Sequence, residues 1–124
     1  MPLANEPIDL VINEGARFYQ KFTWRDKQSL QPIDLTNYMA DMQVRETANS
    51  DTALLTLSTE VITKDGTITL GGQTGTIEFE ILASVLSTLG WRNATYDLLV
   101  YTDADHKDVL FGGRIRVEKI NTRV

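Results

Sequence analysis

The chain has 124 residues, of which 42% are hydrophobic and 23% are charged, so we expect one soluble domain with its own core. Twelve Lys and Arg against seventeen Asp and Glu give a net charge of −5, which argues against binding to nucleic acid backbones. The absence of cysteine excludes disulfides, thiolate metal sites and a cysteine nucleophile, and no apolar run is long enough to span a membrane.

The two ends of the chain carry opposite charge. Residues 1–14 hold acidic side chains and residues 114–124 hold mainly basic ones, and the N-terminus has no secretory signal. The two ends can pair within one domain, which is the favoured reading, or head to tail between subunits. We expect extended arms at residues 1–7 and 119–124, because an extended end can add a strand to a neighbour's sheet. The alternative is a frayed end or an ordinary edge strand.

The first half of the chain alternates with a period of two, which is typical of strands with one buried face. Residues 16–25 and 39–46 both follow this pattern. The apolar positions are Ala16, Phe18, Phe22 and Trp24 in the first segment, and Ala40, Met42 and Val44 in the second. A loop over residues 26–32 separates the two segments, and residues 53–58 form a short apolar run compatible with a strand.

The middle of the chain is rich in turn signals. Asp65-Gly66 predicts a hairpin turn between residues 60–63 and 67–70, and alternation returns over residues 76–81. One stretch has helical spacing, with apolar residues at Leu82, Val85, Leu86 and Leu89. We therefore predict a short helix at about residues 83–89, closed by Gly90 as a left-handed C-cap and laid over an open end of the core.

The last third of the chain again alternates, which predicts strands over residues 95–102 and 109–119. The buried set is predicted to be Tyr96, Leu98 and Val100, followed by Val109, Phe111, Ile115 and Val117. Short strands, each ended by a turn, indicate an all-β fold. We predict an antiparallel Ig-like β-sandwich formed by a single domain over residues 1–124.

Three aspartates, Asp103, Asp105 and Asp108, stand close together near the last strand. An EF-hand loop that started at Asp103 would place Lys107 at its fifth position, and its sixth position would lack the glycine that permits the bend. Aspartate also favours turns, because its carboxylate bonds nearby backbone N–H groups. We therefore predict a hairpin loop here and no metal site.

Other candidates for chemistry are weak. His106, the only histidine, lies at the predicted loop tip without a serine in a strained turn beside it. Glu78 and Glu80 share one face of a strand, as solvent-facing strand positions often do. The segment GGQTG at residues 71–75 lacks the lysine of a phosphate-binding loop, and Asn93 begins a glycosylation sequon in a chain without a signal peptide. We predict no catalytic, cofactor-binding or metal-binding residues and no enzymatic activity.

Aromatic side chains support a rival reading. Trp24, Trp91 and Tyr101 are candidates for a sugar-stacking platform on an exposed face, with Trp91 and Tyr101 its main members. Trp24 nevertheless has the parity of the buried face, and aromatic residues of sandwiches belong more often to the core. A carbohydrate-binding module is therefore the less favoured alternative, and we do not expect a small-molecule ligand.

Five segments in order resemble one family. They are GARFYQKFTW (15–24), PIDLTNYMADMQVR (32–45), GTIEFEI (75–81), YDLLV (96–100) and GGRIRV (112–117). The chain is similar from about Ile8 onward to the small β-sandwich domain of tailed-bacteriophage structural proteins, including the N-terminal domain of the baseplate upper protein family. The most telling segment is PIDLTNY, in which Asp34 and Thr36 can bond the local backbone while Leu35 and Tyr38 plug the end of the sandwich.

The resemblance implies a virion protein that assembles by protein–protein contacts. The expected role is a tail, baseplate or tail-fibre adaptor, and a capsid decoration protein is the alternative. The expected partners are other virion proteins and further copies of the chain, with no nucleic acid and no membrane among them. The expected location is the virion, after synthesis in the cytoplasm of the bacterial host. The resemblance supplies no catalytic residues.

Overall fold

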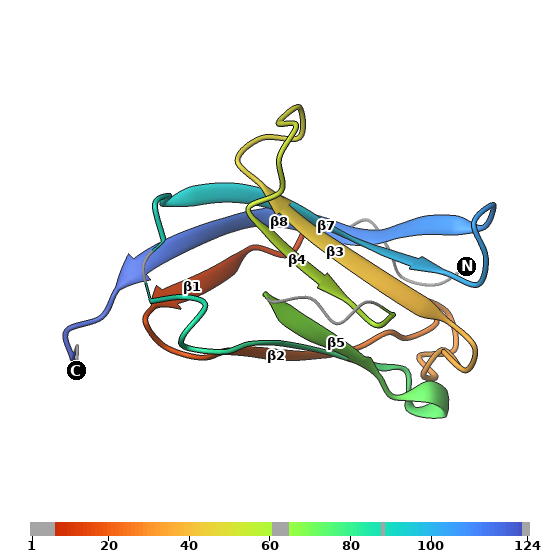
Figure 1. The fold of residues 1–124 in the computed structure, drawn as a ribbon. Coiled ribbons are helices and arrows are strands. Elements are labelled where there is room, and N and C mark those ends of the chain that lie inside the picture. The colour runs from red at the N-terminus through yellow and green to blue at the C-terminus, as the bar shows by residue number, and fades with distance from the viewer. Residues whose placement is uncertain (1–6, 61–64, 88, 123–124) are drawn as a thin grey trace.

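The structure is a computed structural model that describes residues 7–60, 65–87 and 89–122 (Figure 1). Strands predominate because apolar and polar residues alternate along most of the chain. The strands are β1 (Leu10–Glu14), β2 (Phe18–Thr23), β3 (Met39–Arg45), β4 (Leu55–Ser58), β5 (Gly66–Leu70), β6 (Thr76–Ile81), β7 (Asn93–Tyr101) and β8 (Lys107–Lys119). A single 3₁₀ turn, η1 (Gly72–Thr74), joins β5 to β6.

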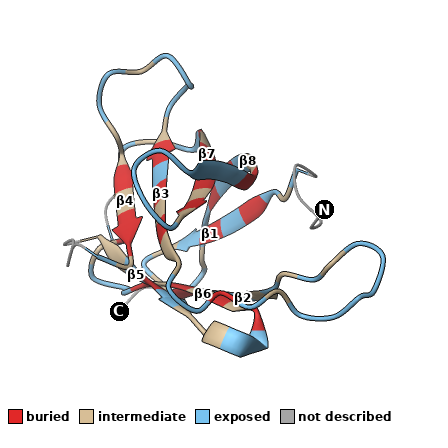
Figure 2. Cartoon of the chain, turned by 90° about the vertical axis from the view of Figure 1, so that its right-hand side faces the viewer, coloured by how far each residue is buried: buried red, intermediate tan, exposed pale blue. Residues whose placement is uncertain are grey.

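The eight strands form one mixed sheet in the order β1-β8-β7-β3-β4-β5-β6-β2. The pairs β1–β8 and β4–β5 are parallel, and the other five pairs are antiparallel. The sheet bends until it is nearly closed into a barrel. In Figure 2, β1, β8, β7 and β3 lie in an upper layer, and β5, β6 and β2 lie in a lower layer. The two layers join through the short β4–β5 ladder, which has only two residue pairs.

The predicted all-β class is confirmed. The finer expectation of an antiparallel Ig-like sandwich is not confirmed, because the strands belong to one sheet with two parallel pairs. The core lies between the layers, where the inward residues of each strand meet (Figure 2). Its largest fully buried side chains are those of Phe79, Ile12, Leu35, Met42, Leu57, Ile77, Ile81, Leu86, Leu98 and Ile115.

The predicted buried face of the last strand is wrong at one position. Val109 is 49% exposed, whereas Leu110 is buried. The β7–β8 register pairs Leu98 with Phe111 and Leu99 with Val109, so Leu110 is an extra residue in a bulge. A bulge inserts one residue and reverses the parity on one side of it, and simple alternation does not predict this.

The predicted helix at 83–89 is not formed by the described residues of that segment. Residues 82–86 make two overlapping turns instead, in which the Val85 and Leu86 amides donate to the carbonyls three residues earlier. The Leu86 carbonyl accepts the Gly15 amide at 2.7 Å, and the Leu89 amide donates to the Glu14 carboxylate at 3.1 Å. The Leu86 carbonyl and the Leu89 amide, which a helix would use for its own hydrogen bonds, are therefore bonded to the β1–β2 turn instead. Gly90 does not have the positive φ of a left-handed cap.

The predicted Asp65-Gly66 hairpin is also wrong. Gly66 begins β5, which pairs with β4 on one side and with β6 on the other, and residues 61–64 lie outside the described residues. The Asp65 carboxylate accepts the Thr56 amide at 2.8 Å, and this bond ties β4 to the start of β5. A side chain on Gly66 would meet the Glu80 carbonyl, so here glycine permits close approach of two strands rather than a turn.

The two chain ends lie side by side within the molecule, but the ion pair that Glu14 forms is with Arg92, which lies outside the basic segment 114–124. β1 pairs in parallel with the C-terminal half of β8, and Glu14 forms an ion pair with Arg92 at 3.5 Å. The predicted start of the C-terminal arm, residue 119, is too early. Lys119 is the last residue of β8 and pairs with Glu14. Residues 1–6 of the expected N-terminal arm and residues 123–124 lie outside the described residues.

Candidate interaction surfaces

The aspartate-rich stretch forms the predicted hairpin loop. β7 ends at Tyr101 and β8 begins at Lys107, and the two strands pair antiparallel. The Asp103 carboxylate accepts the Asp105 amide at 2.9 Å and lies 2.7 Å from His106 Nδ1. The contact with His106 and the backbone bonds lower the pKa of Asp103. Within residues 7–60, 65–87 and 89–122, no group of three or more acids and histidines gathers that could hold a metal ion.

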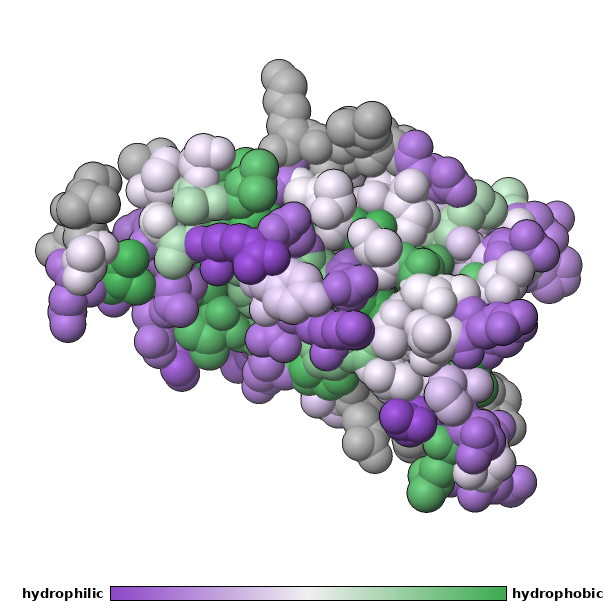
Figure 3. All heavy atoms as spheres, turned by 90° about the horizontal axis from the view of Figure 1, so that it is seen from below, coloured by the Kyte–Doolittle hydropathy of each residue, from purple (hydrophilic) through white to green (hydrophobic). Residues whose placement is uncertain are grey.

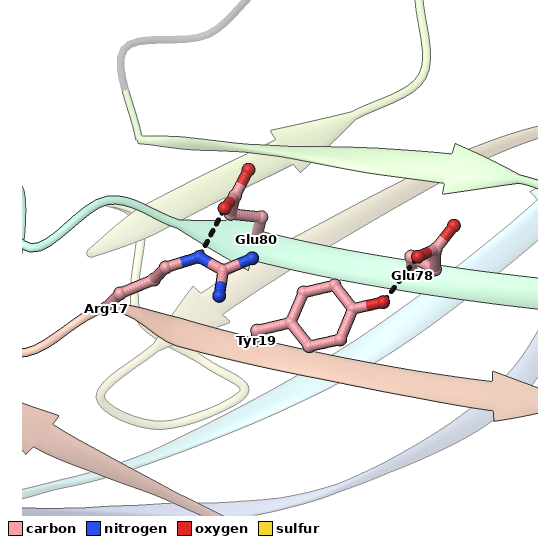
Figure 4. A network of polar contacts seen from close by, with 4 residues as sticks. All are labelled: Arg17, Tyr19, Glu78 and Glu80. Carbon is pink, nitrogen blue, oxygen red and sulfur yellow. Dashed lines mark hydrogen bonds and ion pairs between the residues drawn. The ribbon is translucent and has the colours of Figure 1, made fainter.

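Glu78 and Glu80 lie on the outer face of β6, each within reach of a side chain from the β2 side (Figure 4). Glu80 forms an ion pair with Arg17, and Glu78 accepts a hydrogen bond from the Tyr19 hydroxyl. The Arg17 guanidinium also lies 4.8 Å from the centre of the Tyr19 ring. The hydrogen bond to Glu78 raises the pKa of Tyr19, because a carboxylate acceptor favours the protonated phenol. Both carboxylates therefore serve in cross-strand pairs.

The three aromatic residues considered for sugar stacking do not form one platform. Trp91 lies two residues before β7, and Tyr101 is the last residue of β7. At roughly 3.3 Å per strand residue they are about 30 Å apart. Trp24 packs edge-on against Tyr38, and its indole N–H is buried and finds no hydrogen-bond partner among the described residues. Trp91 is itself partly buried against the core.

The segment PIDLTNY forms the plug that its sequence predicts. The Asp34 carboxylate accepts both the amide and the hydroxyl of Thr36, at 2.9 and 2.5 Å. These bonds lower the pKa of Asp34. The turn places Leu35, which is 2% exposed, in the core, and its amide donates to the Gly72 carbonyl at 2.8 Å. Tyr38 packs against Trp24 and the core, so this segment closes one end of the sheet.

The start of the described chain is fastened to the middle of β8. The Ile8 amide donates to the Gly112 carbonyl at 2.9 Å, and the Ile8 carbonyl accepts the Tyr96 hydroxyl at 2.6 Å. The Asp9 carboxylate accepts the Arg114 amide at 3.0 Å. Burial, together with the charge of Asp9, raises the pKa of Tyr96. These bonds determine where β1 begins.

Sequence reasoning missed β1, and with it a free edge of the sheet. The signal was present, because Ile8, Leu10 and Ile12 alternate with Asp9, Val11 and Asn13, but the apolar Val11 on the outer side weakens the pattern. β1 and β2 are the two ends of the strand order, so among the described residues each has a strand neighbour on one side only. Unpaired strand edges are places where another chain can add a strand.

Exposed apolar side chains are dispersed over the surface. In the described residues, the large ones that are most exposed are Val11, Tyr19, Leu30, Leu82 and Val109. Figure 3 shows one face, seen from below, on which hydrophobic residues form separate patches among hydrophilic ones. Leu30 is 61% exposed at the tip of a hairpin that follows β2, where the Asp26 carboxylate accepts the Gln28 and Ser29 amides.

The fold and these surfaces define an all-β domain with two free sheet edges and a projecting hairpin. No family model and no curated protein sequence matches the chain. None of the described residues lies in a helix long and apolar enough to cross a membrane. The titratable groups considered above are engaged in turns and cross-strand pairs.

Proposed function

We propose that the protein is a noncatalytic structural component of a tailed-bacteriophage particle, which assembles through protein–protein contacts with other virion proteins and with copies of itself. Its most suitable role is a tail, baseplate or tail-fibre adaptor. A capsid decoration protein is the second candidate, because both roles require a small stable domain whose function lies in its outer surface.

The plug at residues 32–38 carries the proposal. This segment is the most telling part of the resemblance to phage β-sandwich domains, and its Asp34 turn and buried Leu35 form the plug that its residues predict. The free edges of β1 and β2 and the exposed Leu30 hairpin further support a role in assembly, since such features suit contacts between proteins. Support for a carbohydrate-binding module is weaker, because Trp91 and Tyr101 lie at opposite ends of β7.

The test is to locate the chain in purified particles. We expect quantitative mass spectrometry of phage particles to find it at a fixed copy number, and separation of tails from heads to place it with the tails. Recovery with the heads would favour the decoration role. Recovery only in the unassembled fraction would contradict the proposal.

A second experiment addresses the expected N-terminal arm. A chain that lacks residues 1–6 should enter particles less efficiently than the full chain, if that segment contributes to assembly. A chain with Leu30→Ala is a useful comparison, because it tests the projecting hairpin instead while leaving the core intact. Normal incorporation of the shortened chain would remove the arm from the proposed mode of assembly.

A further inference from the structure

The two free edges of the sheet differ in sequence and can be compared residue by residue. On the β2 side, the Trp24 amide donates to the Gly75 carbonyl at 2.8 Å, and this bond continues the register of the β2–β6 ladder. In an antiparallel ladder, alternate residues point their backbone groups toward the paired strand. The backbone groups of Tyr19 and Lys21 therefore point away from β6, toward the free edge.

The same argument identifies the free positions of β1. The Ile8 amide donates to the Gly112 carbonyl, which continues the parallel β1–β8 register. Alternate residues of β1 therefore point their backbone groups at β8, and those of Val11 point away from it. Val11 is 42% exposed and Tyr19 is 41% exposed, so each free edge presents one large apolar side chain at a position whose backbone is also available.

An antiparallel register that places Val11 opposite Tyr19 also places an acidic residue opposite a basic one at a neighbouring pair. Asp9 then lies opposite Lys21, and Asn13 lies opposite Arg17. Cross-strand pairs between an aromatic and a β-branched residue, or between opposite charges, are among the favourable ones in sheets. A lysine on an edge strand ordinarily discourages pairing. In this register, however, it meets the carboxylate of Asp9, of which one oxygen, Oδ1, accepts the Arg114 amide.

One molecule does not make this pairing with itself. The turn between β1 and β2 is held by the Gly15 amide, which donates to the Leu86 carbonyl at 2.7 Å, and it carries the chain from one layer to the other. β1 continues beside β8 while β2 continues beside β6. The complementary edges are therefore available to a second copy.

We propose that β1 of one copy pairs antiparallel with β2 of the next, with Val11 against Tyr19 and Asp9 against Lys21. Because the contact joins two different edges, it repeats head to tail and produces a ring or a filament. This inference deepens the proposed function, on which it rests for its biological context, by naming the contact between copies.

The absence of native cysteine allows a direct test by disulfide cross-linking. Directly opposite residues in a hydrogen-bonded antiparallel pair have Cα atoms about 5.5 Å apart, within the roughly 4.4–6.8 Å that a disulfide bridges. Val11→Cys and Tyr19→Cys chains are purified separately and mixed under mild oxidation. We expect the yield of disulfide-linked heterodimer to be several-fold higher than in a control mixture of Tyr19→Cys with Val109→Cys. Val109 is the control because its side chain is similarly exposed.

Two results would overturn the inference. One is equal cross-linking in the Val109→Cys mixture, which would indicate random collision. The other is a double variant, Val11→Cys with Tyr19→Cys, that forms its disulfide only within single chains, which would indicate closure of the barrel on itself.

A second measurement does not depend on cysteine chemistry. In native mass spectrometry over a concentration series, Val11→Lys should weaken self-association at least about tenfold, because a buried ammonium opposes strand addition. Val109→Lys should leave self-association unchanged. Unchanged association of the Val11→Lys chain would contradict the edge contact. These experiments use the purified chain, so their failure leaves the test in particles standing, and absence from particles leaves the cross-linking result standing.

Discussion

Gly113 lies where two segments far apart in sequence approach each other closely. A Cβ atom at this position would collide with the Ile8 carbonyl, which accepts the Tyr96 hydroxyl. The absence of a side chain thus allows the start of the described chain to lie against β8, and the hydroxyl of a buried tyrosine then satisfies the carbonyl. β1 can therefore take its position beside β8 only because residue 113 is a glycine.

Gly113→Ala should therefore destabilise the protein by about 2–3 kcal/mol, because the Ile8 backbone must move and its hydrogen bonds weaken. Urea unfolding followed by circular dichroism measures the change. Gly90→Ala is the matched control, since a Cβ there meets no atom within 4 Å, and its effect should stay within about 0.5 kcal/mol. Equal effects of the two substitutions would show that the close approach at Gly113 does not matter.

Tyr101 gives a residue-level prediction on pH. Partial burial and the hydrogen bond to the Asp41 carboxylate raise the pKa of Tyr101 to about 12, whereas an unfolded tyrosine has a pKa of about 10. The folded form holds the proton more tightly, so this contribution to stability is complete below about pH 10 and is lost as the pH rises toward 12. We expect the melting temperature to fall less between pH 10 and 12 in Tyr101→Phe than in the natural chain. Parallel curves for the two chains would contradict this.

At the scale of single elements, the segment after β6 departs furthest from its prediction. Its apolar spacing predicts a helix, yet residues 82–86 form turns whose Leu86 side chain is fully buried. Helical spacing and a pair of turns bury nearly the same residues, because both bring positions three and four apart to one side. The hydrogen bonds to the β1–β2 turn decide between them.

Leu86→Ala should destabilise the protein by roughly 2–5 kcal/mol, because it removes a fully buried side chain at an end of the core. Thermal and urea unfolding measure the loss. Leu82→Ala, in the same segment but 58% exposed, serves as the control and should change stability by about 0.5 kcal/mol or less. A small effect of Leu86→Ala would mean that the turn segment packs only loosely against the sheet.

At the scale of the whole molecule, the order of the strands determines which strands are hydrogen-bonded to a neighbour on both sides. β3 and β7 are central in their part of the sheet, while β1 and β2 are its ends. The edge residues Val11 and Tyr19 have amides that point away from the paired strand, so they lack the protection that a second neighbour supplies. The same two positions are those proposed to join one copy to the next.

Amide hydrogen exchange tests this view of the whole molecule. In dilute protein, the amides of Val11 and Tyr19 should exchange orders of magnitude faster than those of Met42 and Leu98, whose opening requires nearly global unfolding. At concentrations where copies associate, the Val11 and Tyr19 amides should become slower, while the exposed loop at residues 102–106 should not change. Slow exchange at both edge positions in dilute monomer would show that these edges are already covered.

Residue patterns alone predict the all-β class, the inward face of β2, β3, β6 and β7, the Asp34 plug and the aspartate loop. All of these depend on alternation or on hydrogen bonds between residues two or three positions apart. Such local patterns can be predicted from a single sequence. Three features are established by the fold and not by these patterns: β1 pairs in parallel with β8, Leu110 lies in a bulge, and Gly66 lies in a strand. These features depend on contacts between segments distant in sequence, and alternation of side chains does not specify which strand lies beside which.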